Sequence, residues 1–106
     1  MKTIRDGLRY DTEKAILIGE ASNGGSYSDF SHWDAGLYRT PRSGRYFLAG
    51  SGGPMTRFAR QGPQQNETRG GSGIQPMDEQ EALEWAEQYL THDEIEAAFG
   101  EKLEDA

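Results

Sequence analysis

The last third of the chain carries apolar side chains at the three- and four-residue intervals of a helix with one buried face. Asp78 and Glu81 precede this pattern at the spacing of a capping box, so a helix is predicted to begin there. Thr91 and Glu94 repeat the spacing and predict a second, shorter helix, which Gly100 ends or frays. The apolar positions of the two helices are Ala82, Leu83, Trp85, Ala86, Tyr89, Leu90, Ile95, Ala98, Phe99 and Leu103.

The first half of the chain predicts short strands instead. Residues 32–40 alternate, with Trp33, Ala35 and Leu37 on one face and Tyr38 on the other. A second aromatic-rich strand is predicted at 45–49, and the turn between them has Pro41 at a position that suits a type I turn. Further short strands are expected at 15–18, at an edge within 4–10 and at 56–59.

Glycine-rich segments separate these elements. Residues 23–26 predict a loop, 50–53 a turn or bulge, and 61–73 a flexible loop that includes a linker at 70–73. We therefore expect one domain, 1–106, made of a strand-rich body (1–60), the flexible loop (61–73) and an acidic helical section (74–106). The predicted fold class is α+β: an antiparallel sheet of three to four strands, followed by two C-terminal helices packed on one face. The helical residues expected to make that contact are Leu83, Trp85, Ala86, Tyr89, Leu90, Ile95 and Phe99.

Charge divides the 106-residue chain, whose net charge is −7, into two unlike parts. Residues 1–75 carry a net charge of +3, and residues 76–106 carry −10. There is no cysteine, which excludes disulfides, thiolate metal sites and thiol catalysis. The longest apolar stretch, 15–18, is too short to span a membrane, and the first residues lack the apolar core of a signal peptide. A cytoplasmic protein is expected.

The acidic helical section is the first candidate binding surface. One interpretation is a solvated helical face that confers solubility. The other is a surface that imitates the negative charge of nucleic acid and blocks the Arg/Lys channel of a partner protein. The candidate residues are Asp78, Glu79, Glu81, Glu84, Glu87, Asp93 and Glu94.

The body offers an alternative surface for nucleic acid. Its basic residues are mostly arginines that alternate with aromatic residues, a combination used to hold single strands. The alternative is that the aromatic rings face the core, or support a dimer interface, while the arginines cover the sheet edge. The candidate residues are Arg39, Arg45, Arg57, Tyr38 and Tyr46.

Catalytic signals are weak. His32 and Asp34 stand two residues apart, which suits an acid–base pair or half a metal site, but an exposed polar pair on a strand explains the spacing equally simply. The candidate nucleophiles are Ser26, Ser28, Ser31 and Ser51, and none lies in a GxSxG elbow. Phosphate-loop and dinucleotide motifs are missing from the glycine runs. We expect a protein that is not an enzyme and uses no metal or cofactor.

Several short motifs resemble those of a family of small proteins from phages and mobile elements. The resemblance covers roughly residues 10–90, and its setting is similar to that of anti-CRISPR proteins. It implies a non-enzymatic inhibitor that binds a bacterial defence protein, most simply a CRISPR effector subunit, in the host cytoplasm, and it carries over no catalytic residue. The motifs are YDTEKA at 10–15, LYRTP at 37–41, YFLAG at 46–50, GGPMT at 52–56, IQPM at 74–77 and EALEW at 81–85.

Overall fold

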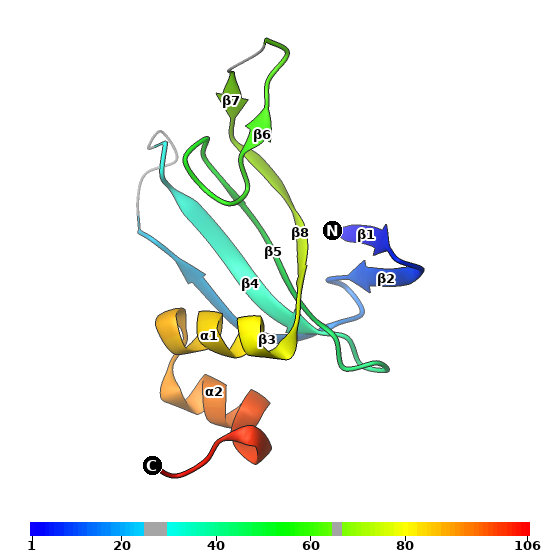
Figure 1. Ribbon diagram of the computed structural model, residues 1–106, viewed down its shortest axis with the longest axis vertical. Helices are drawn as coiled ribbons and strands as arrows, with labels where there is room; N and C mark the ends of the chain where they lie inside the picture. The colour runs from blue at the N-terminus through cyan, green and yellow to red at the C-terminus, as the bar shows by residue number, and fades with distance from the viewer. Residues whose placement is uncertain (25–29, 65–66) are drawn as a thin grey trace.

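A computed structural model describes residues 1–24, 30–64 and 67–106 of the chain. It has the α+β fold predicted from the sequence, with a four-stranded antiparallel sheet in the order β3-β4-β5-β8 followed by two C-terminal helices (Figure 1). Two small hairpins, β1–β2 and β6–β7, stand beside this sheet. The elements are β1 Lys2–Arg5, β2 Leu8–Asp11, β3 Ile16–Ser22, β4 Trp33–Arg39, β5 Tyr46–Gly52, β6 Arg60–Gln61, β7 Thr68–Arg69, β8 Gly71–Met77, α1 Glu79–Tyr89, α2 His92–Phe99 and the 3₁₀ turn η1 Gly100–Lys102.

The hairpin β4–β5 forms the centre of the sheet, as the alternating pattern predicts. The backbone N–H of Thr40 donates to the carbonyl oxygen of Arg45 at 2.8 Å, which closes the turn. Gly44 has φ 64, a conformation that a glycine adopts without steric cost. Leu37 and Tyr38 point to opposite faces of β4, the first toward the helices and the second away from them.

β5 runs further than predicted. Residues 50–52, expected to form a turn or bulge, continue the strand and pair with β4 on one side and β8 on the other. A side chain at Gly50 would collide with the backbone carbonyl of Asp34, so glycine here permits close backbone packing. This glycine is a requirement of the strand and does not interrupt it.

β8 corrects the prediction for the segment that precedes the helices. Gly71–Met77 pairs with β5 along all seven residues, so the expected linker at 70–73 is wrong from Gly71 onward. The rest of the expected loop includes the two-residue strands β6 and β7, and residues 65–66 lie outside the described residues. Pro76 is tolerated because β8 is an edge strand, where a missing N–H that points away from β5 breaks no ladder bond.

Two further strand predictions are corrected. The edge strand expected within 4–10 is a separate hairpin, because Asp6 and Gly7 both have positive φ (53 and 77) and reverse the chain. Residues 56–59 form turns and not a strand, and they bury Phe58 against the helix-side core. β3 begins one residue after the predicted start and extends to Ser22.

Both helices begin where the capping pattern predicts. The Asp78 carboxylate accepts from the Glu81 N–H at 2.8 Å, and the Thr91 hydroxyl accepts from the Glu94 N–H at 3.2 Å. α1 lies against β5 and β8, and α2 lies against β3. The helices therefore cover one face of the sheet, through residues that include Trp85, Ala86, Ile95 and Phe99, with Leu83 and Leu90 packed at the margin.

The opposite face is covered in part by the β1–β2 hairpin. Tyr10 packs edge-on against Phe47, with ring centroids 5.5 Å apart, and Tyr38 stacks on the same ring at 5.2 Å. The remainder of this face holds a hollow of about 620 Å³ whose walls include Glu20, Asp34 and Tyr38. Among the helices that the structure describes, none is long and apolar enough to cross a membrane.

Candidate functional site

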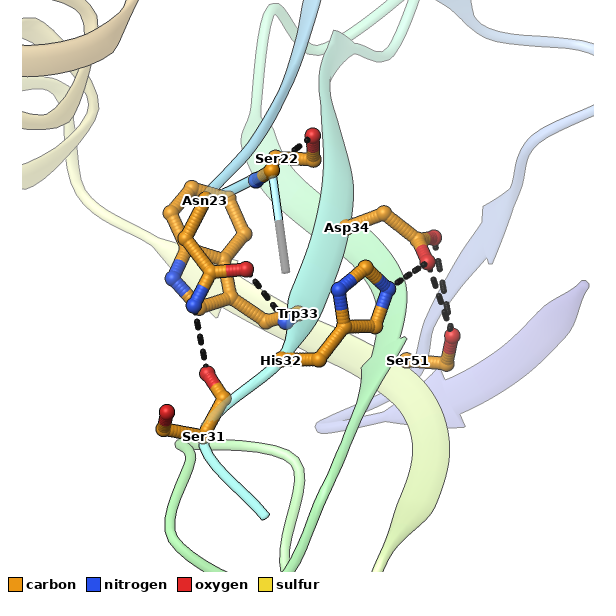
Figure 2. Close-up of polar contacts among 8 residues, drawn as sticks. Ser22, Asn23, Ser31, His32, Trp33, Asp34 and Ser51 are labelled. Atoms are coloured by element: carbon orange, nitrogen blue, oxygen red, sulfur yellow. Dashed lines mark hydrogen bonds and ion pairs between the residues drawn. The ribbon is translucent and has the colours of Figure 1, made fainter. Parts of the chain in front are cut away.

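A cluster of polar side chains lies where β4 begins and β5 ends (Figure 2). His32 Nε2 is 3.6 Å from Asp34 Oδ2, and the Ser51 hydroxyl lies 3.5 and 3.4 Å from the two oxygens of that carboxylate. His32 is 9% exposed, so the expected exposed pair is wrong for the histidine. The spacing of His32 and Asp34 does not predict this burial, because the burial depends on the path of the chain just before β4.

The order of contacts in this cluster is Ser51–Asp34–His32. A serine nucleophile is activated by a base in direct contact with its hydroxyl, and an acid then orients that base. Here the carboxylate, and not the imidazole, faces the hydroxyl. In the described ranges, no three His, Asp or Glu side chains come together as metal ligands. The cluster has the geometry of a side-chain hydrogen-bond network that joins β4 and β5.

Asn23 extends this hydrogen-bond network to β3. Its side-chain amide donates to the Ser31 carbonyl at 2.6 Å, and its side-chain oxygen accepts from the Trp33 N–H at 3.1 Å (Figure 2). The end of β3 is thus fixed to the start of β4. Two candidate nucleophiles, Ser26 and Ser28, lie outside the described residues.

Five of the seven candidate acidic residues have side-chain contacts within the protein. Three have structural roles at the helix starts: the Asp78 and Glu81 side chains each accept from the other's backbone N–H, and Glu94 accepts from the Thr91 N–H at 2.9 Å. Two others have a side-chain partner: Glu79 pairs with Lys102, and Glu84 accepts from Gln80 at 2.9 Å.

We define the acidic surface as the exposed carboxylates of α1 and α2 and of the cap that precedes α1. Glu84 and Glu87 stand three positions apart on α1 and therefore lie on one helix face, while Asp93 opens α2. Glu94 is half-buried against β3 and is not counted. The members are Asp78, Glu79, Glu81, Glu84, Glu87, Asp93 and Glu96.

Few cations neutralise this surface. Residues 76–106 contain eleven carboxylates and one basic residue, Lys102. The hydrogen bond from Lys102 to Glu79 raises the pKa of the lysine above its ordinary value, so the one cation is engaged. The other ion pairs within the described parts of the chain join body residues, Arg69 with Glu67 and His32 with Asp34. The helical section therefore carries a large excess of negative charge.

The predicted Arg/aromatic face is not assembled. Tyr46 is 3% exposed and stacks on Phe99 beneath the helices, whereas Tyr38 packs on the other side of the sheet. The reason is the register of the β4–β5 pair. Tyr38 lies opposite Phe47, so these two side chains point to the same face of the sheet. Tyr46 precedes Phe47 in β5, so its side chain points to the other face. Arg39 and Arg45 flank the β4–β5 turn, whereas Arg57 lies beside β8.

The structure places Arg57 in a different basic group, whose other members the sequence did not indicate. A groove of about 550 Å³ runs between β1 and the outer edge of β8. Its lining includes Lys2, Arg5, Arg57 and Arg60, and none of its lining residues, all of which the structure describes, is acidic. More than 50 positions separate the two halves of this group in the sequence, so only the fold brings them together.

Comparison with protein-family models, with curated proteins and with solved structures gives no match.

Proposed function

We propose that this protein is a non-enzymatic inhibitor that binds a bacterial defence protein through its acidic surface. The observation that carries the proposal is the cluster of seven exposed carboxylates on and beside two helices whose section holds one lysine, already paired. The resemblance of residues 10–90 to a phage and mobile-element family favours a CRISPR effector subunit as the partner. The site of action is then the cytoplasm of the bacterial host.

Electrostatic complementarity supplies the mechanism. A nucleic-acid channel is lined by arginine and lysine, which bind phosphates largely through charge neutralisation and counterion release. A helix that presents Glu84 and Glu87 on one face offers a comparable row of anionic oxygens on a rigid support. Charged surfaces of opposite sign also accelerate association and fix the orientation of the complex. The inhibitor would occupy the channel in place of nucleic acid.

The contacts within the protein indicate which carboxylates are available for this role. Asp78 and Glu81 are hydrogen-bonded in a capping box, and Glu79 is paired with a lysine. The Glu87 and Asp93 carboxylates are exposed and take part in no hydrogen bond or ion pair within the described residues, and the Glu84 carboxylate has a single contact with a neighbouring glutamine. Binding energy is expected from the last three.

A nucleic-acid-binding module built on the Arg/aromatic face is not proposed as a second function. Its two tyrosines lie on opposite faces of the sheet, so the five candidates do not form one surface. A hydrolase at His32 is not supported either, because Asp34 lies between the imidazole and the Ser51 hydroxyl.

The test is a pull-down from nuclease-treated lysate of bacteria that carry active CRISPR systems. The bait is the tagged wild-type protein, a Glu84→Gln/Glu87→Gln variant or a Glu13→Gln/Glu20→Gln control. Each variant removes two exposed carboxylates, so both change the net charge equally. Close charge pairs across an interface contribute about 1.5 kcal/mol or more each, so the first variant should retain a partner at least tenfold less well.

Recovery of an effector subunit by the wild type and by the control, with loss in the helix variant, supports the proposal. Equal recovery by all three baits contradicts the acidic-surface mechanism. Circular dichroism of each bait checks that the helices are intact.

A further inference from the structure

The groove along the outer edge of β8 gathers cations from two distant parts of the chain. Lys2 and Arg5 come from β1, and Arg57 and Arg60 come from the segment that follows β5. All four side chains are exposed, and Ser72 and Gly73 of β8 also line the groove. The groove therefore combines accessible positive charge with small lining residues, which take up little of its space.

These four cations lack partners of opposite charge. None of them forms an ion pair within 1–24, 30–64 and 67–106, and Arg60 donates a side-chain hydrogen bond to the Ser72 carbonyl oxygen. Arg60 also stands directly opposite Arg69 in the β6–β7 register. Like charges at directly opposed positions destabilise a strand pair, so the Arg60–Arg69 pairing does not contribute to the stability of this hairpin.

We propose that this groove binds the phosphate backbone of single-stranded nucleic acid. Three of the four cations are arginines, whose planar fork matches phosphate oxygens in bidentate pairs. The groove has a volume of about 550 Å³, which is large enough to admit a short stretch of one strand. The one aromatic residue in the lining, Phe58, is 4% exposed, so no ring is available for base stacking. Binding is then directed at the backbone and independent of base sequence.

The acidic helices do not prevent this binding. They pack on the face of the sheet opposite the one that the β1–β2 hairpin covers, and Figure 1 shows β1 beside β8 and away from α2. The groove and the acidic surface share no residue. The inference is therefore independent of the proposed inhibitor function, because it involves other residues and another ligand.

The test measures fluorescence anisotropy of a labelled oligo-dT strand, roughly 12 nucleotides long, within the site sizes of single-strand grooves. A matching oligo-U strand distinguishes RNA from DNA. The proteins are the wild type, an Arg5→Gln/Arg57→Gln variant and an Arg9→Gln/Arg42→Gln control, whose two arginines are exposed and do not line the groove. Each phosphate contact to a single strand contributes about 0.7 to the slope of the logarithm of the binding constant against the logarithm of the salt concentration. Loss of one contact therefore weakens binding about eightfold at 50 mM salt. The groove variant should bind on the order of sixtyfold more weakly, and the control should bind like the wild type.

Three results would overturn the inference: absence of strand binding by the wild type at low salt, equal weakening by both variants, or tighter binding of a labelled poly-glutamate peptide than of either strand. Thermal unfolding of each variant shows whether the fold is retained. If Arg5→Gln/Arg57→Gln is unfolded, a Lys2→Gln/Arg57→Gln variant takes its place with the same expectation.

Discussion

Replacing Phe99 with alanine removes the side chain that anchors α2 to the sheet. Phe99 is 1% exposed, and its ring stacks on Tyr46 with centroids 5.3 Å apart and planes inclined by 18°. Truncation of a fully buried phenylalanine costs about 3–5 kcal/mol, which includes the loss of the stacked pair. A domain of this size is stable by roughly 5–15 kcal/mol, so the variant should lose a large share of its free energy of unfolding.

The assay is urea denaturation followed by tryptophan fluorescence. Trp33 and Trp85 report on the helix–sheet interface, because their ring centroids lie 6.3 Å apart across it. With a typical urea dependence of about 1.5 kcal/mol per molar, the midpoint should fall by about 2 M or more. Phe30→Ala makes the same change at a side chain that is 67% exposed and should shift the free energy by less than about 0.5 kcal/mol. A loss below about 1 kcal/mol for Phe99→Ala would refute the packing of α2 described above.

Further predictions concern turns, caps and charge. Gly44→Ala should destabilise the protein by about 1–2 kcal/mol in the same assay, because φ 64 disfavours a β-carbon. Asp78→Ala should cost about 1 kcal/mol, whereas Glu81→Gln should be close to neutral, since glutamine also completes a capping box. The Glu79 contact raises the pKa of Lys102 above 10.5, so its stabilisation is present at lower pH and disappears as pH rises through the raised pKa. The difference in urea midpoint between wild type and Glu79→Gln should therefore vanish at high pH.

Local rules predicted much of this fold. The two capping boxes are patterns of four residues, and their hydrogen bonds depend on no other part of the chain. The β4–β5 hairpin follows from alternation on both sides of one turn. The acidic residues were equally predictable as a helical cluster, because helical spacing places Glu84 and Glu87 together whatever lies beneath them.

Other features depend on contacts that sequence spacing does not encode. Gly50 and Gly71 lie in regular strands, whereas composition alone suggested a turn and a linker. A side chain at Gly50 would meet the backbone of β4, and one at Gly71 would meet the Phe58 carbonyl and the Arg60 side chain. The basic groove joins Arg5 to Arg57 through the placement of one hairpin beside an edge strand. The predicted Arg/aromatic face is an example of the reverse, in which residues that are close in sequence are separated by the fold. Tyr46 and Phe47 are adjacent in β5, and the strand register directs their side chains to opposite faces of the sheet.

The most direct test of the proposed function is competition between this protein and nucleic acid for the recovered effector subunit. Labelled target nucleic acid is bound to the purified subunit, and its anisotropy is followed as the protein is added. Displacement by the wild type, with at least tenfold more Glu84→Gln/Glu87→Gln variant needed for the same effect, is the predicted result. A ternary complex in which the nucleic acid stays bound would contradict occupation of the same channel.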